Sequence, residues 1–69
     1  MRDPNRIKTM CDRLEMIWST VPDWRFGQLM ENVRREIAHN GRDIFFMEDE
    51  ELFVLMEYMF YPKGDADGL

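Results

Sequence analysis

The sequence predicts an all-α domain: a small three-helix bundle with a short extended connector before the third helix. Three segments carry apolar residues at spacings of three and four, which is the period of an amphipathic helix. Proline, aspartate and an Asn-Gly pair mark where these helices begin and end. Only residues 42–47 could be extended, and a single strand cannot form a sheet. The chain of 69 residues should form one domain over residues 1–61, followed by a flexible tail over residues 62–69.

The first helix is expected over residues 4–19. Asp3 is a suitable N-cap, and Pro4 fits the first helical position because the N–H that proline lacks would have no partner there. The apolar face includes the single cysteine, which is therefore expected to be a small core residue. The residues of this face are Ile7, Met10, Cys11, Leu14, Ile17 and Trp18.

The second helix is expected over residues 23–39. Asp23 is the predicted N-cap, and Asn40-Gly41 is a typical helix end because glycine readily adopts the left-handed conformation. The predicted core face consists of Phe26, Leu29, Met30, Val33 and Ile37.

The side of the second helix that faces away from the predicted core is mostly polar. At about 100° per residue, it holds Trp24, Gln28, Glu31 and Arg35. Gly27 lies on a flank and lowers helix stability by about 1 kcal/mol relative to alanine. Either a neighbouring backbone approaches closely at this glycine, or the first turn of the helix simply tolerates it.

The connector RDIFFM is expected to cover the open end of the core. Alternate side chains of an extended segment point to the same side. The pair that covers the core should therefore be either Ile44 and Phe46 or Phe45 and Met47.

The third helix is expected over residues 49–61, and it begins within four consecutive acidic residues, Glu48 to Glu51. Each acid in a first turn stabilises a helix by about 0.3–1 kcal/mol, because it faces the positive end of the helix dipole and unpaired N–H groups. Consecutive residues point in different directions, so these carboxylates cannot converge on one metal ion without outside ligands. The acids are therefore expected to start the helix rather than to bind metal.

The third helix also carries more apolar surface than one side of a helix can bury. Val54, Tyr58 and Tyr61 lie opposite the expected core face, between glutamates. Exposed apolar and tyrosine side chains are typical of an interface. Alternatively, these three side chains lie flat beneath the connector or the tail. The expected core face consists of Leu52, Phe53, Leu55, Met56, Met59 and Phe60.

Few side chains could support catalysis, so an enzyme is not expected. The chain has one serine, Ser19, one cysteine, Cys11, and one histidine, His39, which is expected in the last turn of the second helix. One Cys and one His are too few for a zinc site. No catalytic residue, metal, cofactor or small-molecule substrate is therefore predicted. A single unpaired thiol and the absence of a signal peptide or a long apolar run predict a cytoplasmic protein without a membrane span.

Charge is distributed unevenly along the chain. Residues 1–42 hold eight Lys/Arg and six Asp/Glu, a net of +2, whereas residues 43–69 hold one Lys and eight Asp/Glu, a net of −7. The acidic last segment could pair with the basic first part of the same chain, or it could mimic nucleic-acid charge on a basic partner.

Direct DNA binding is disfavoured. A helix-turn-helix would use the exposed residues of the second helix, but Glu31 and Glu36 lie among them, and the overall net charge of −5 would repel phosphate. The candidate DNA-contacting residues are Gln28, Asn32, Arg34 and Arg35.

Several short motifs resemble those of a family of short, uncharacterised bacterial proteins of the YihD type. They are DPNRI, Trp18, PDWRFGQL and EDEEL, and the likeness extends from Asp3 to about Met59. The resemblance implies a compact helical protein without an assigned activity, whose relatives also occur in phage and prophage regions. The Met-rich third helix and the tail PKGDADGL depart from that pattern.

The sequence therefore favours a small non-enzymatic interaction module that docks on itself or on another protein. The expected contact residues are Val54, Tyr58 and Tyr61, with Trp24 and Arg35 as a second surface. The alternatives are an acidic inhibitor of a basic protein and, third, helix-turn-helix DNA binding.

Overall fold

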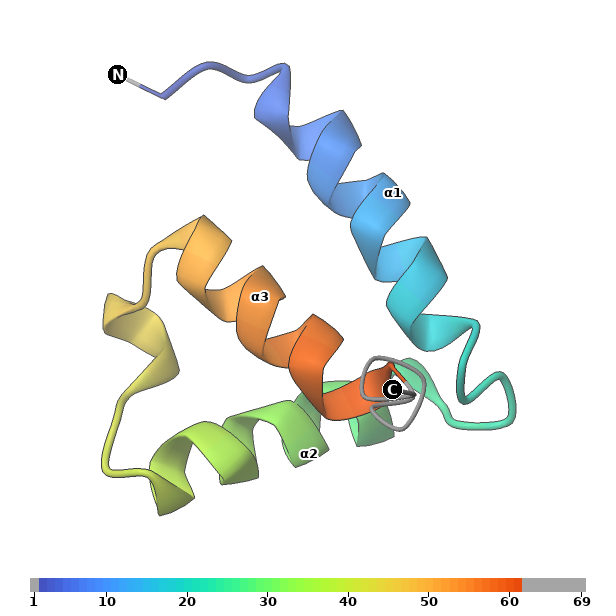
Figure 1. The fold of residues 1–69 in the computed structure, drawn as a ribbon, viewed down its shortest axis with the longest axis vertical. Coiled ribbons are helices and arrows are strands. Elements are labelled where there is room, and N and C mark those ends of the chain that lie inside the picture. The colour runs from blue at the N-terminus through green and yellow to red at the C-terminus, as the bar shows by residue number, and fades with distance from the viewer. Residues whose placement is uncertain (1, 62–69) are drawn as a thin grey trace, which may run out of the picture.

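The computed structural model describes residues 2–61 and contains three α-helices and one 3₁₀ turn (Figure 1). No strand is present in this range, which confirms the all-α prediction. The predicted tail lies outside the described residues. The elements are α1 (Arg6–Trp18), α2 (Phe26–His39), η1 (Ile44–Phe46) and α3 (Asp49–Phe60).

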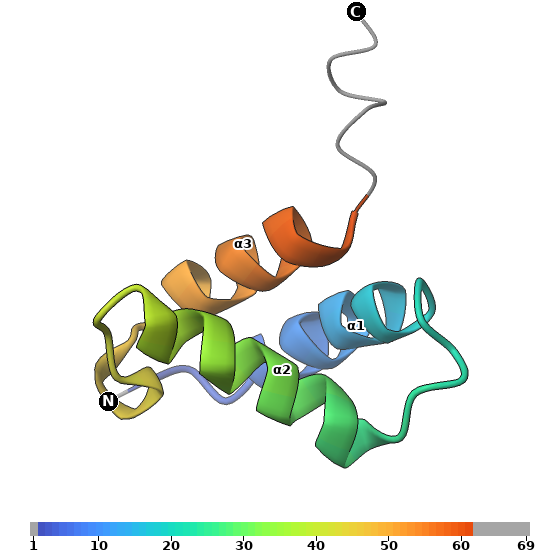
Figure 2. The same cartoon turned by 90° about the horizontal axis from the view of Figure 1, so that it is seen from below.

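Helices α1 and α3 run side by side in the same direction, and α2 crosses them as the connection between the two (Figures 1 and 2). Two ion pairs show the parallel register: Arg6 meets Asp49 near the start of both helices, and Arg13 meets Glu57 further along. The core lies where the three helices meet. Its fully buried side chains are Ile17, Leu29, Val33, Ile37 and Met56.

The start of α1 differs from the prediction: the N-cap is Asn5 rather than Asp3, it makes no side-chain cap hydrogen bond, and the α-helix begins two residues later than expected. The Asp3 carboxylate accepts a hydrogen bond from the Asn5 N–H at 2.9 Å. Residues 4 and 5 form a turn in which the Arg6 N–H donates to the Asp3 carbonyl at 3.2 Å. Asp3 therefore stabilises the turn that leads into the helix.

The prediction that Cys11 is a core residue is wrong, because its side chain is exposed. The apolar face of α1 is covered mainly in its second half, where Ile17 is buried and Leu14 and Trp18 pack against the core. Ile7, the second residue of α1, remains 53% exposed. The place where the other helices meet α1 thus decides which part of the apolar face is buried.

The start of α2 differs from the prediction, because the helix begins at Phe26 rather than near Asp23. The preceding residues form a turn, in which the Trp24 N–H donates to the Val21 carbonyl at 3.0 Å. Gln28 then caps the helix: its side-chain oxygen accepts the Arg25 N–H at 2.8 Å. Phe26 was expected in the core but is 46% exposed, since it occupies the first turn and packs its ring at 5.3 Å from that of Trp18.

The end of α2 confirms the Asn40-Gly41 prediction. Gly41 has φ of +78°, in the left-handed region. Its N–H donates to the Ala38 carbonyl at 2.9 Å, and the Arg42 N–H donates to the Ile37 carbonyl at 3.0 Å. These two bonds form the Schellman motif that satisfies the last carbonyls of a helix.

The connector is a 3₁₀ turn rather than an extended segment, and both predicted core pairs are wrong. Ile44 and Met47 pack against the core, whereas Phe45 and Phe46 are exposed. A 3₁₀ turn has three residues per turn, so residues three apart share one side. Asp43 supports the turn by accepting the Phe45 N–H at 3.0 Å.

Helix α3 places its predicted core face inward: Met56 is buried, and the other five residues of that face pack around the core. Val54 and Tyr58 are exposed, as predicted for the opposite face. The prediction for Tyr61 is wrong, because this residue follows the last turn of α3 and packs against the core. No helix in residues 2–61 is long and apolar enough to cross a membrane.

Candidate interaction surfaces

The four consecutive acids at the start of α3 each contact a different arginine. Because the side chains radiate around the helix, each carboxylate reaches a separate part of the chain. Within the described range, no group of His, Cys, Asp and Glu side chains is arranged to hold a metal ion. The predicted pairing of the acidic segment with the basic first part of the chain is therefore confirmed. The pairs are Glu48–Arg2 at 3.2 Å, Asp49–Arg6 at 3.0 Å, Glu50–Arg13 at 2.9 Å and Glu51–Arg42 at 2.8 Å.

Arg13 is the main polar link between α1 and α3. Its Nε and Nη2 donate to the two carboxylate oxygens of Glu57, both at 2.8 Å. The guanidinium also lies 5.2 Å from the centre of the Phe53 ring, within the range of a cation–π contact. The hydrogen bonds from Arg13 lower the pKa of Glu57 below its ordinary value, and those to Glu57 and Glu50 raise the pKa of Arg13.

The outer face of α3 carries a shallow apolar hollow, which we call the α3 hollow. Val54, Leu55 and Tyr58 form it, and its volume is about 590 Å³. Val54 is 51% exposed and Tyr58 is 65% exposed. Two of the three predicted contact residues therefore lie together at one surface, and Tyr61 does not line it. The rim consists of Glu48, Glu50 and Glu51.

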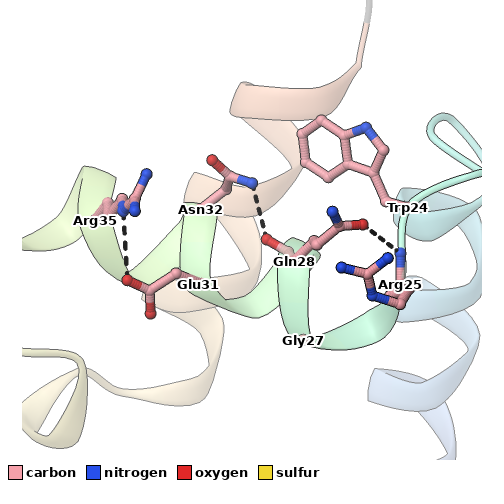
Figure 3. A pocket seen from close by; sticks show the side chains of 7 residues that line it. All are labelled: Trp24, Arg25, Gly27, Gln28, Glu31, Asn32 and Arg35. Atoms are coloured by element: carbon pink, nitrogen blue, oxygen red, sulfur yellow. Dashed lines mark hydrogen bonds and ion pairs between the residues drawn. The ribbon is translucent and has the colours of Figure 1, made fainter.

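A second surface, the α2 groove, lies along the outer side of α2 (Figure 3). It has a volume of about 710 Å³, and an adjoining hollow of about 490 Å³ shares Trp24, Asn32 and Arg35 with it. The structure thus brings Trp24 and Arg35 together, as predicted for the second surface. The groove is lined by Trp24, Arg25, Gly27, Gln28, Glu31, Asn32 and Arg35.

Trp24 does not point fully away from the core, which corrects the sequence prediction. It is half-buried and meets Phe60 edge-on, with the ring centres 5.7 Å apart. Its carbonyl accepts a hydrogen bond from the indole N–H of Trp18 at 2.9 Å. Because Trp24 precedes the first turn of α2, its position is set by the turn before the helix rather than by the helical period. The Trp24 ring is therefore held by Phe60, and the Trp24 backbone is held by Trp18.

The polar side chains of the α2 groove are held by local hydrogen bonds. The Asn32 amide N–H donates to the Gln28 carbonyl at 2.8 Å. Glu31 accepts two hydrogen bonds from Arg34, at 3.0 and 2.7 Å, and lies 3.3 Å from Arg35. The bonds from Arg34 lower the pKa of Glu31. These contacts keep Glu31 ionised and divide its charge between two arginines.

Gly27 forms part of the groove without a side chain, and a Cβ atom placed there would meet nothing within 4 Å. The close backbone approach that the sequence allowed is therefore absent at this position. The other alternative holds: the first turn tolerates glycine, which leaves open space in the groove.

One exposed aromatic pair was missed by the sequence analysis. Phe45 and Phe46 are 81% and 75% exposed, and their rings meet edge-on with centres 4.9 Å apart. The assumption of an extended connector assigned one phenylalanine to the core. An aspartate followed by apolar residues three apart, Ile44 and Met47, was the available signal for a turn.

The three candidate nucleophiles and bases lie on separate parts of the helices. Cys11 is exposed on α1, and His39 ends α2. Ser19 follows α1, and its hydroxyl donates to the Glu15 carbonyl at 2.6 Å. The serine therefore lies at the C-cap of α1, where its backbone N–H and its hydroxyl both donate to the Glu15 carbonyl.

Comparison of the chain with protein-family models, with curated proteins and with solved structures finds no match. The resemblance to the YihD-type family therefore stays a prediction.

Proposed function

We propose that this protein is a small, non-enzymatic interaction module that docks on a protein partner through the α3 hollow. The supporting observation is the exposure of Val54 and Tyr58 beside Leu55, on a helix whose other side already packs on the core. Apolar side chains gathered at one place on a surface mark an interaction site more often than scattered ones do.

The small size of the core supports the same proposal. Five side chains are fully buried in the described part of the chain, and a domain of this length gains little stability from one core. A partner that covered the α3 hollow would remove further apolar surface from water and would stabilise the folded state. We expect the partner to be another protein or a second copy of this chain.

The alternative in which the acidic segment mimics nucleic-acid charge receives less support. Each of the four acids at the start of α3 has an arginine of the same chain beside it, so the field that they present to a partner is reduced. The rim of the α3 hollow is thus better suited to exclude water around an apolar contact than to attract a strongly basic surface.

The resemblance to YihD-type proteins suggests where the protein acts, but it does not identify a binding site. It supports a bacterial or prophage interaction module in the cytoplasm, and it brings no catalytic or binding residues with it.

Light scattering over a range of protein concentrations, combined with affinity capture from the native host, tests the proposal. We expect the wild-type chain to self-associate or to retain a partner, and Val54→Glu to lose that association. Met16→Glu is the matched control, because Met16 is 62% exposed on α1 and lines neither surface. A monomer whose captured proteins are the same for wild type and Val54→Glu would contradict the proposal.

A further inference from the structure

The arginines of the described chain are almost all paired with carboxylates, and the exception lies in the α2 groove. Arg25 has no carboxylate oxygen within ion-pair distance among residues 2–61. Every other arginine in that range has one within 3.3 Å. These are Arg2, Arg6, Arg13, Arg34, Arg35 and Arg42.

Arg35, at the other end of the groove, is only partly neutralised. Its partner Glu31 gives both carboxylate oxygens to Arg34, and Arg35 is left with a single contact at 3.3 Å. Its side chain is 71% exposed. The groove therefore presents two cationic groups, with Arg25 fully and Arg35 partly available to an anion from outside.

The rest of the groove adds apolar and hydrogen-bonding surface between the two arginines (Figure 3). The Trp24 ring, fixed against Phe60, forms one wall. Gln28 uses its amide oxygen to accept the Arg25 N–H, so its amide N–H groups remain as donors toward the groove. The open space at Gly27 leaves room for a ligand close to the backbone of α2.

We propose that the α2 groove binds an extended acidic segment of a partner protein. Arg25 and Arg35 are ten positions apart, which corresponds to about 15 Å along a helix at about 1.5 Å per residue. An extended peptide covers that distance in about four to five residues, at about 3.3 Å per residue. The segment therefore carries two Asp or Glu residues at that spacing, with an apolar side chain between them that packs on Trp24.

A peptide fits the charges better than a nucleic acid does. Glu31 lines the groove, and Glu36 lines the hollow that continues it. A chain of phosphates would pass close to both carboxylates, and the protein as a whole carries a net charge of −5. A peptide with two separated carboxylates places its negative charges at the arginines alone. This site is distinct from the α3 hollow and does not depend on it.

Fluorescence anisotropy on the full chain tests the proposal with labelled synthetic peptides of about ten residues. Each peptide carries two glutamates on a Gly/Ser background with one leucine between them, and the series varies the glutamate spacing from about two to about seven residues. We expect the tightest binding at a spacing of about four to five, weakening as salt rises. An oligothymidylate of equal net charge serves as the nucleic-acid probe.

Three variants locate the binding site. Arg25→Gln should weaken peptide binding by about tenfold, whereas Arg2→Gln, which removes the same charge at a residue that does not line the groove, should not. Gly27→Leu should fill the groove and abolish binding while leaving the thermal midpoint the same or higher, because no atom lies within 4 Å of the added Cβ. In Gly27→Leu, lost peptide binding with an unchanged or higher thermal midpoint therefore shows that the site is blocked while the fold is intact.

Two kinds of result would overturn the proposal. One is peptide binding that does not depend on the glutamate spacing, that persists in Gly27→Leu, or that is absent at every spacing. The other is tighter binding of the oligothymidylate at physiological salt, which would assign the groove to nucleic acid instead. Neither result depends on Val54 or on the α3 hollow, so the two proposed surfaces are tested independently of each other.

Discussion

The inner face of α2 is held by the burial of apolar side chains, whereas the seam, the line along which Arg13 of α1 meets Glu57 of α3, is held by an ion pair. Leu29, Val33 and Ile37 of α2 are at most 1% exposed. At the seam, Arg13 and Glu57 remain 23% and 24% exposed, and their contact is a pair of directed hydrogen bonds. Apolar burial depends on area and has no preferred direction, whereas a bidentate ion pair fits one geometry. The core thus supplies most of the stability, and the charges set how α1 lies along α3.

The largest expected effect follows from shortening a core side chain of α2. Leu29→Ala removes buried apolar atoms and leaves a cavity, and we expect a cost of about 2–5 kcal/mol in the free energy of unfolding. In a domain this small, that loss would unfold a large part of the population. Urea denaturation followed by circular dichroism measures it. Val54→Ala, on the exposed face of α3, should change the stability by less than about 0.5 kcal/mol.

A smaller effect is expected at the seam. Arg13→Gln removes the bidentate bonds to Glu57 and the cation–π contact with Phe53, and we expect a loss of about 1–2 kcal/mol at neutral pH. Arg34→Gln is the matched control, because its pair with Glu31 joins two exposed side chains of a single helix and should contribute much less. Equal losses of stability in the two variants would show that the Arg13–Glu57 pair contributes no more than an exposed ion pair does.

The pH dependence of that loss tests its cause. Arg13 lowers the pKa of Glu57 in the folded state below the ordinary value of 4.5. The stabilisation is therefore fully present above that value and is lost as the pH falls through the lowered pKa. The difference in thermal midpoint between wild type and Arg13→Gln should shrink as the pH is lowered from neutral to about 3. A difference that stayed constant would indicate lost packing instead of a lost ion pair.

The smallest effects are expected at two glycines that have different backbone conformations, one in the first turn of α2 and one just beyond its end. Gly27→Ala should stabilise the protein by about 0.4–1 kcal/mol, since a Cβ meets nothing there and alanine is the better helix former. Gly41→Ala should destabilise it by about 1 kcal/mol, because φ is +78° and alanine is strained in the left-handed region. Thermal midpoints of the two variants that shift in the same direction would contradict this assignment.

Some features of the candidate surfaces could be predicted from the sequence and others could not. The helical period correctly placed Val54 and Tyr58 on the outside of α3 and Arg35 on the outside of α2. It failed for Trp24 and Tyr61, because both lie just beyond a helix end, where the chain no longer follows 3.6 residues per turn. It also could not show that Arg25 has no carboxylate partner among residues 2–61, since several arginine–carboxylate pairs, such as Arg6–Asp49 and Arg13–Glu57, join residues far apart in the chain.

The sequence by itself determined that three helices form, which face of α2 enters the core and where α2 ends, because periodicity and the Asn-Gly pair are local properties. Only the tertiary structure decided which end of α1 is covered, which phenylalanines of the connector stay exposed and which arginine each acid meets. Those outcomes depend on where the helices cross and in which direction α1 and α3 run. Such a crossing is set by the packing of all three helices together, and no single segment encodes it.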